Sequence, residues 1–462
     1  MATPLLSPRK MVVRGIQWLA PGLKVKRYLL LVPIGLVPVI CGVALLSRLR
    51  TQELLDDAER WGRSHGGLDI GEPRFYLPVG ITLVLLGLLL ILGALIAVNR
   101  SIVGVISPEH LDTLPEVIQR KRSLSQGVRI VVIGGGTGLS TLLRGLKQHS
   151  SNLTAIVTMT DDGGSSGLLQ KQLGGILPPG DIRNCLVALA DAEPLMQQLF
   201  QFRFSTRDEK DGLSGHSFGN LLIAAMAEIT GDFEKAIEKT SEILAIRGRV
   251  LPSTIEAVVL VGKMADGREL TGETRIAADP VAIEQITLCP GSPRALPEAL
   301  EAIREADIVV LGPGSVYTSV IPNLLVPEIA RAVAETKALR FYICNVMTQK
   351  GETDGFSASD HVLALEKHLP GLPVGRKIVD FVLVNDALPS PDLQERYARA
   401  GAEVVIADFE VIRSLGYHPV VGKFLSESQV VRHDADRIAH AVLQLWQQKG
   451  TGFTRPRRRS AR

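Results

Sequence analysis

The chain has 462 residues, enough for two or three structural units. Its formal net charge of +3 is close to neutral, which argues against a protein that binds nucleic acid over its whole surface. Four cysteines, Cys41, Cys185, Cys289 and Cys344, lie far apart and form no Cys-x-x-Cys pair. This spacing argues against a zinc site and a disulfide framework, and it fits a reducing compartment.

The N-terminal part predicts a membrane hairpin. A basic arm at 1–27 precedes two uncharged apolar runs, at 28–47 and 75–98. Each run has about the 20 residues that a helix needs to cross a bilayer, so both are predicted to be transmembrane helices. A signal peptide is the alternative for the first run. The long basic region before it, and the second run after it, favour the hairpin.

The distribution of Lys and Arg predicts the orientation of this hairpin. Six basic residues precede the first run: Arg9, Lys10, Arg14, Lys24, Lys26 and Arg27. The segment 48–74 between the runs, with five arginines and six acids, is predicted to be an extracytoplasmic loop. Two spans then return the chain to the cytoplasm, so we expect a multi-pass protein of the cytoplasmic membrane with a cytoplasmic C-terminal domain.

The remaining chain predicts a linker at 99–127, one folded domain at 128–450 and a basic disordered tail at 451–462. In the domain, short β-branched runs alternate with helical patterns. That alternation is typical of an α/β fold, a doubly wound, Rossmann-like parallel sheet. We predict strands at 129–133, 153–159, 307–313, 340–346, 380–386 and 402–408. We also predict a helical subdomain at 180–247 and a β-hairpin insertion at 253–277, around the turn Asp266–Gly267.

The first candidate site is the glycine loop after the first of these strands. It contains four glycines in five residues and leads into a helix: Gly134, Gly135, Gly136, Thr137 and Gly138. Glycines let a backbone approach a phosphate, and a helix N-terminus supplies amide donors. The dinucleotide fingerprint is incomplete, because Leu139 stands where its last small residue would be. A tight turn without a ligand is the alternative.

The segment "TDDGGSSG" after the second predicted strand is the second candidate. Its adjacent acids, Asp161 and Asp162, suit a divalent cation such as magnesium, and Ser165 and Ser166 suit a polar substrate. An exposed acidic turn is the alternative. Two further segments, "PPGDIRN" and "GLSGHSFGN", add five candidate ligand contacts: Arg183, Asn184, His216, Ser217 and Asn220. Helix capping is their alternative role, and a Ser-His nucleophile pair is disfavoured because adjacent residues rarely face each other.

Two later loops also follow predicted strands. The loop "GPGSVYTS" offers Gly312, Gly314 and Ser315, and the loop "CNVMTQKGETDGFSASDH" offers Asn345, Thr348 and Gln349. Asp360 and His361 suit either a metal or a helix cap. Because ligands of doubly wound sheets bind beyond the carboxyl ends of the strands, all these loops predict one polar cleft for a phosphorylated, hydroxylated ligand.

Together these motifs closely resemble the YvcK-like gluconeogenesis factor family, within the wider superfamily of CofD-like 2-phospho-L-lactate transferases. The resemblance runs in order from Val128 to about Gln447. It implies a protein that binds UDP-N-acetylglucosamine and supports cell shape and wall synthesis during growth on gluconeogenic carbon, without a settled reaction. It also implies that Tyr397 and Arg432 contact the nucleotide-sugar. Cell-wall synthesis proteins and further copies of the chain are the partners we expect beside the membrane.

Two enzymatic alternatives remain at this point. The transferase relatives move a phospho-group from a nucleotide-diphosphate-linked donor with magnesium, and in that reading Asp161 and Asp162 hold the metal and orient the attacking hydroxyl. A nicotinamide oxidoreductase is the other alternative. The incomplete fingerprint at Leu139 and the doubled aspartate argue against it. A non-catalytic nucleotide-sugar-binding regulator is the leading hypothesis.

Overall fold

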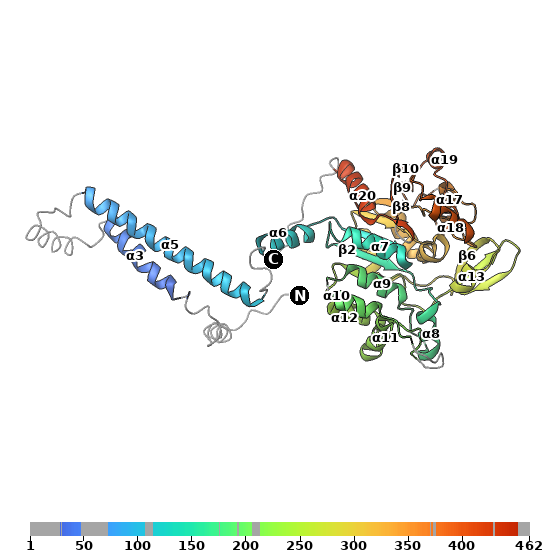
Figure 1. Ribbon diagram of the computed structural model, residues 1–462, viewed down its shortest axis with the longest axis horizontal. Coiled ribbons are helices and arrows are strands. Elements are labelled where there is room, and N and C mark those ends of the chain that lie inside the picture. Colours follow the sequence, from blue (N-terminus) through green and yellow to red (C-terminus); the bar gives the residue numbers. More distant parts are fainter. Residues whose placement is uncertain are drawn as a thin grey trace, which may run out of the picture. The chain divides into compact units, whose positions relative to one another are not determined.

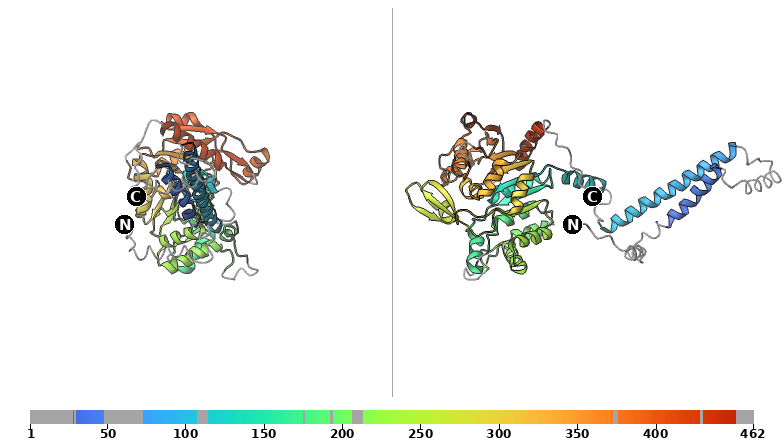
Figure 2. Two further views of the ribbon diagram at one scale, coloured as in Figure 1. Left: turned by 90° about the vertical axis from the view of Figure 1, so that its left-hand side faces the viewer. Right: turned by 180° about the vertical axis from the view of Figure 1, so that it is seen from behind.

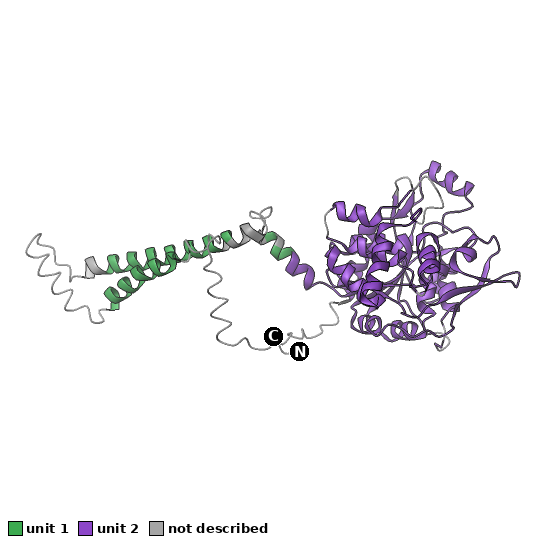
Figure 3. Cartoon of the chain, turned by 90° about the horizontal axis from the view of Figure 1, so that it is seen from below, with its two compact units in different colours: residues 1–120 green, residues 121–462 purple. Residues whose placement is uncertain are grey.

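The computed structural model describes residues 28, 30–47, 73–106, 114–174, 176–191, 194–205, 213–369, 371–372, 376–427 and 430–450. The predicted basic arm at 1–27, the predicted tail at 451–462 and nearly all of the predicted loop at 48–74 lie outside these residues. The chain divides into two compact units, residues 1–120 and 121–462 (Figure 3).

The first unit contains two apolar helices, α3 (Leu31–Ser47) and α5 (Pro73–Ile106), which pack against each other. Glycines allow the close approach. A Cβ at Gly42 would lie 2.6 Å from the carbonyl oxygen of Gly80, and one at Gly87 would lie 2.5 Å from that of Gly35. Small residues of this kind are typical of helix contacts in membranes.

Only one described helix is long and apolar enough to cross a membrane. It is the Leu77–Val98 part of α5, 22 residues long. The prediction of two spanning helices is therefore supported only in part. As a helix, the predicted span at 28–47 runs over only the 17 residues of α3. At about 1.5 Å per residue, α3 falls short of the ~30 Å hydrocarbon core.

The second unit is built on a parallel sheet, as predicted. Within the described residues its seven strands lie in the order β10-β9-β8-β7-β1-β2-β3, and every neighbouring pair is parallel. Their bounds are β1 Ile130–Gly134, β2 Leu153–Val157, β3 Arg249–Pro252, β7 Ile308–Leu311, β8 Leu339–Ile343, β9 Phe381–Asn385 and β10 His418–Gly422. From β1 the chain proceeds first to β2 and β3, then returns to β7 on the other side, so the sheet is doubly wound.

Helices connect these strands (Figure 1). Helix α7 packs against both α9 and α20, and α14 packs on α16. The predicted helical subdomain at 180–247 comprises α9 to α12, and α8 precedes it. The bounds are α6 Leu114–Ser125, α7 Gly136–Leu146, α8 Gly164–Leu173, α9 Gly180–Leu189, α10 Pro194–Gln201, α11 Phe218–Thr230, α12 Phe233–Leu244, α14 Pro297–Glu305, η2 Val316–Val320, α15 Ile321–Leu324, α16 Pro327–Glu335, α17 Ala358–Lys367, α18 Pro391–Arg399, α19 Phe409–Ser414 and α20 Ala435–Gly450.

The predicted strand at 402–408 is wrong. Its residues make only isolated bridges, from Val404 to Met347 and from Ile406 to Ser357, and the Ile406 side chain is 67% exposed. The position beside β9 is taken instead by β10, which was not predicted. The run of Val404, Val405 and Ile406 has the β-branched, apolar composition of a buried strand. In the structure it lies across the start of α17 and is not part of the sheet.

The insertion after β3 is a three-stranded antiparallel sheet rather than a hairpin. It contains β4 (Val259–Met264), β5 (Glu269–Thr271), α13 (Glu273–Ala278) and β6 (Ile283–Cys289), with β4 in the middle. The predicted turn between β4 and β5 is present, with Gly267 at a φ of 86°. This insertion projects from the main sheet in both views of the second unit (Figures 1 and 2).

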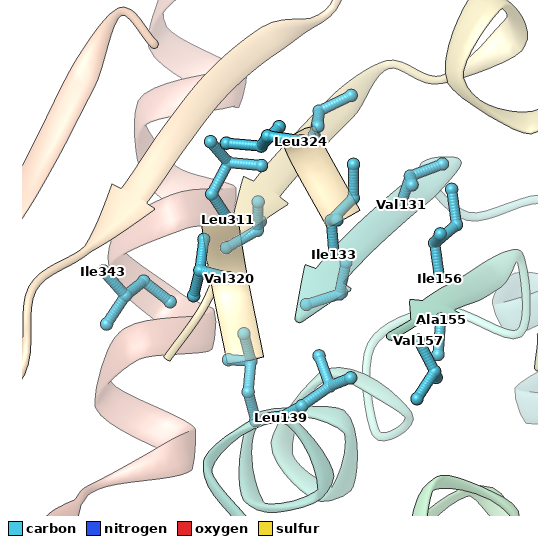
Figure 4. Close-up of a cluster of buried hydrophobic side chains, with 14 of the residues drawn as sticks. Val131, Ile133, Leu139, Ala155, Ile156, Val157, Leu311, Val320, Leu324 and Ile343 are labelled. Carbon is cyan, nitrogen blue, oxygen red and sulfur yellow. The ribbon is translucent and has the colours of Figure 1, made fainter. Parts of the chain in front are cut away.

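The core of the second unit lies around the central strands. Side chains from β1, β2, β7 and β8 pack with Leu139 of α7, Val320 of η2 and Leu324 of α15 (Figure 4). All five residues of β1 and all five of β2 are buried, which is what strands with helices on both faces require. This rigid centre holds the loops that follow β1 and β7.

Candidate functional site

The candidate site lies at the switch point of strand order. Strands β1 and β7 are neighbours, and the connections that follow them lead to opposite sides of the sheet. A doubly wound sheet leaves a crevice at this point, outside the carboxyl ends of the strands. The loops at 134–138 and 312–315 follow these two strands and meet there.

The β1 loop is packed tightly, and its glycines are structurally required. Gly136 has a φ of 65°, in the left-handed region. A Cβ at Gly138 would lie 2.6 Å from the carbonyl oxygen of Pro313 in the β7 loop. The Gly136 amide donates to the Asp181 carboxylate at 2.7 Å, so a carboxylate satisfies one amide at the start of α7.

A pocket of about 260 Å³ lies between these loops, and nine predicted ligand residues line it. They come from the β1, β7 and β8 loops, from α18 and from β12 (Val431–His433). The nine are Thr137, Gly138, Gly314, Ser315, Asn345, Thr348, Gln349, Tyr397 and Arg432. A second pocket of about 410 Å³ shares Thr141, Arg432 and His433 with the first. The loops after β1, β7 and β8 thus share one pocket, whereas the predicted segments at 160–167, 178–184 and 212–220 do not line it.

Two other cavities lie away from these loops. One, of about 370 Å³, opens at the amino ends of β1, β2 and β3, and another, of about 540 Å³, lies between α14 and α16. Residues predicted to bind the ligand do not line either cavity. Position at the switch point, rather than size, therefore identifies the candidate site.

Other predicted ligand residues form a separate buried network between α8, α9 and α11. The Ser165 hydroxyl lies 3.2 Å from His216 Nδ1 and accepts from the Ser217 amide. Ser217 also caps α11, because its hydroxyl accepts from the Asn220 amide at 3.1 Å. Arg183 donates to Ser217 and to Asn184. These residues do not line the 260 Å³ pocket, so their predicted ligand role stays a prediction.

Two atoms of this network have no partner in the described structure, Arg183 Nε and Asn220 Oδ1. The remaining predicted residues also stand outside the pocket lining. The Ser166 hydroxyl accepts from the Gly180 amide at the start of α9, and Gly134, Gly135, Gly136 and Gly312 shape the backbone of the two loops.

The two predicted metal ligands have different surroundings. Asp162 Oδ1 accepts from the amide and the hydroxyl of Thr274, at 2.9 and 2.7 Å, and so caps the first turn of α13. Asp161 Oδ1 accepts from the Gly163 amide at 3.0 Å. Among the residues that the structure describes, no group of three or more His, Cys, Asp or Glu is arranged to hold a metal ion. A magnesium role for the pair stays a prediction.

Asp360 is a helix cap, with Ser357 as its partner. The Ser357 hydroxyl accepts from the Asp360 amide, and the Asp360 carboxylate accepts from the Ser357 amide, which together form a capping box at the start of α17. His361 is fully buried, and its Nδ1 contacts the Ser357 carbonyl at 2.8 Å.

Three carboxyl groups lie behind the glycine loops, of which Glu352 is buried and Asp181 and Glu273 are partly exposed. Burial and the Asp161 carboxylate raise the pKa of Asp181 to about 6, against the hydrogen bond from Gly136. Burial, with the charges of Asp161, Asp181 and Glu352, raises the pKa of Glu273 to about 9. Burial also raises the pKa of Glu352, which accepts from the Ser315 hydroxyl.

Through hydrogen bonds and charge interactions, these carboxyl groups link the loops at 134–138 and 312–315 to the acidic segment at 160–167. Asp181 has a local signal in the sequence, because an aspartate directly after Pro179-Gly180 is typical of a helix start. Glu273 carried none, because it comes from the insertion and reaches the site only through the fold. At neutral pH, Glu273 is protonated and can donate a hydrogen bond. Its neighbours Asp181 and Glu352 accept hydrogen bonds from the Gly136 amide and the Ser315 hydroxyl.

Comparisons with known proteins agree with this fold. Residues 130–425 match the family model described as 2-phospho-L-lactate transferase CofD. A gluconeogenesis factor from Halalkalibacterium halodurans is 50% identical over 316 residues, which are 68% of this chain and 95% of the relative. A Nostoc sp. relative named "Putative gluconeogenesis factor" is 45% identical over 437 residues, 94% of this chain and 92% of its own.

A solved structure shows the same fold. It is the crystal structure of a member of the UPF0052 family from Bacillus halodurans, 51% identical, with a TM-score of 0.64 over 68% of this chain and 98% of its own. The resemblance read from the glycine loop, the acidic segment and the later loops is thereby confirmed. The chain belongs to the 2-phospho-L-lactate transferase CofD family and, within it, to the YvcK-like gluconeogenesis factors.

Proposed function

We propose that this gluconeogenesis factor is a regulator that binds UDP-N-acetylglucosamine at the carboxyl edge of its sheet and supports cell shape and wall synthesis during growth on gluconeogenic carbon. The observation that carries this proposal is the pocket lined by nine predicted ligand residues. They come from segments up to nearly 300 residues apart, and Tyr397 and Arg432 are among them.

The chemistry of the lining suits a nucleotide-sugar. Arg432 supplies a planar cation for a diphosphate, and Tyr397 supplies an aromatic face and a hydroxyl for a ring. Hydroxyls and amides of the β1, β7 and β8 loops suit the hydroxyl groups of sugars. Of the two adjoining pockets, the one of about 410 Å³ falls in the range expected for small-molecule sites, roughly 300–1,000 Å³, and the one of about 260 Å³ lies just below it.

Titration calorimetry of the full chain in detergent tests this proposal. UDP-N-acetylglucosamine, GDP and NAD are titrated with and without magnesium, and the recovered ligand is analysed. We expect saturable binding of the nucleotide-sugar, recovery of the intact compound, and at least tenfold weaker binding to the variant Arg432→Ala. Equal affinity for NAD, or no binding of the nucleotide-sugar, would contradict the proposal.

A magnesium-dependent transfer reaction is the second candidate, and one observation favours it. Asp161, after β2, lies near the carboxyls of Asp181 and Glu273, and Asp181 accepts from the Gly136 amide of the glycine loop. Turnover of a nucleotide-diphosphate-linked compound that requires magnesium and is lost in Asp161→Asn would establish this reading. The intact nucleotide-sugar after long incubation would exclude it for that compound.

We further propose that the first unit anchors the chain in the cytoplasmic membrane as a two-helix hairpin. The apolar length of α5 and the glycine packing of α3 against it support this. Both chain ends are then cytoplasmic. Protease treatment of spheroplasts should leave tags at either end intact, and cleavage of a C-terminal tag from outside would overturn the orientation. Wall-synthesis proteins and further copies of the chain remain the partners we propose.

A further inference from the structure

The β11–β12 hairpin carries the cation of the proposed site. Strands β11 (Leu425–Glu427) and β12 (Val431–His433) pair antiparallel, with Ser426 opposite Arg432. Among the described residues that line the two adjoining pockets, Arg432 is the only lysine or arginine. Its exposed guanidinium makes no hydrogen bond or ion pair with the described part of the chain, so its position depends on its backbone.

Two contacts tie this backbone to the rest of the domain, one on each side of Arg432. The Val431 amide donates to the Tyr397 hydroxyl at 3.1 Å. His433 Nε2 lies 3.0 Å from the carbonyl oxygen of Cys344, the residue that follows β8. A carbonyl can only accept, so Nε2 carries the hydrogen. Cys344 is buried at the carboxyl end of β8, an inner strand of the main sheet, and it is therefore a rigid attachment point.

The hairpin needs such attachments because it is small. Each strand has three residues, and a two-stranded hairpin is at best marginally stable in water without other packing. Desolvation lowers the pKa of His433 to about 4, against the bond to Cys344. His433 is therefore neutral at physiological pH and adds no second positive charge beside Arg432.

We propose that His433 is a positioning residue, whose Nε2–H bond to Cys344 fixes β12 to the end of β8 and so holds Arg432 over the pocket. The effect on ligand affinity rests on the proposed nucleotide-sugar binding. The effect on the hairpin itself does not, because the bond joins two groups of the protein.

Two substitutions of His433 test whether the hydrogen bond to Cys344 is required, rather than the histidine ring itself. In His433→Gln the side-chain amide nitrogen reaches the position of Nε2 and keeps a donor for Cys344. In His433→Asn the amide is too short to reach. Arg432→Ala removes the cation without removing either attachment, and His440→Asn, on the exposed face of α20, is a histidine control outside the two pockets.

Each variant of the full chain in detergent is measured in two ways. Amide hydrogen exchange of 425–427 and 430–433 without ligand reports the attachment, and calorimetry with UDP-N-acetylglucosamine reports affinity. We expect His433→Asn to exchange at least tenfold faster in the hairpin and to bind at least tenfold more weakly. His433→Gln should stay within about threefold of wild type in both measurements. Arg432→Ala should lose affinity with unchanged exchange, and His440→Asn should change neither.

The two readouts distinguish the possible failures. If wild type binds and His433→Asn exchanges faster with full affinity, the bond holds the hairpin but does not position Arg432, and the proposal is overturned. Equal exchange in His433→Asn and His433→Gln would also overturn it. Absence of binding to wild type, with fast exchange only in His433→Asn, would refute the ligand rather than the attachment.

Discussion

The substitution Glu273→Gln should stabilise the protein at neutral pH. Glu273 is largely desolvated beside Asp161, Asp181 and Glu352, and its pKa rises from an ordinary 4.5 to about 9. At pH 7 the folded state therefore keeps a proton that the unfolded chain has released. Folding must recover that proton, so the stability contributed by this group is complete below about pH 4.5 and falls as the pH rises toward 9.

The size of the effect follows from the pH difference. From pH 4.5 to pH 7, keeping Glu273 protonated lowers the free energy of unfolding by about 1.4 kcal/mol for each pH unit, which gives a loss of about 3 kcal/mol at pH 7. This figure does not depend on whether the folded pKa is 8 or 9, because the carboxyl is protonated at pH 7 in either case. Glutamine has nearly the same shape and titrates in neither state, so it removes the cost.

Urea unfolding of the full chain in detergent, followed by fluorescence at pH 5 and pH 7, measures this difference. Relative to wild type, Glu273→Gln should gain about 3 kcal/mol of unfolding free energy at pH 7 and under 1 kcal/mol at pH 5. Glu269→Gln, exposed on β5 of the same insertion, should gain nothing at either pH. A variant that is less stable than wild type at pH 7, or a gain independent of pH, would refute the reasoning.

Three further predictions follow from the packing. Gly138→Ala places a Cβ 2.6 Å from a carbonyl oxygen of the β7 loop and should cost about 1–3 kcal/mol in urea unfolding, whereas Gly134→Ala, with its nearest atom at 3.7 Å, should cost less than 1 kcal/mol. Asp162→Ala removes the cap of α13 and should lower the free energy of unfolding by about 1 kcal/mol. Amide exchange should become faster in α13 alone, and unchanged exchange there would argue against the cap. Gly87→Leu should separate α3 from α5 and speed amide exchange of α3 in micelles, while Gly93→Leu, whose Cβ meets nothing within 4 Å, should not.

The central part of the fold could be predicted because its strands are buried on both faces. Continuous, β-branched apolar runs such as Ile130–Ile133 and Phe381–Val384 are typical of strands that are covered on both faces. The edge strands carried weaker signals. Strand β10 begins with His418 and Pro419 and is half exposed, and β3 ends in a proline, so neither resembles a buried strand. The apolar run at 404–406 resembles one without being in the sheet.

The candidate site was predictable where a loop follows a strand directly. Thr137 and Ser315 lie in the pocket for that reason, because parallel strands deliver their carboxyl ends to one edge. Tyr397 was selected by resemblance, since a tyrosine on a helix surface has no local signal of its own. Glu273 was missed because it lies over 110 residues after Asp161 in the sequence, and only the folding of the insertion brings the two charges together.

The doubly wound topology has a consequence for access to the site. The segment from α6 enters the second unit at the amino end of β1, where the Gly127 carbonyl and Asn152 are hydrogen-bonded, and the pocket opens at the carboxyl end of the same strand. Five residues of strand separate the two points, roughly 15 Å. Any tether attached through α6 thus pulls on the edge opposite the pocket mouth. Under the proposed anchoring and ligand binding, the tether and the pocket mouth would occupy different edges of one sheet, so that a metabolite would exchange while the chain stays attached.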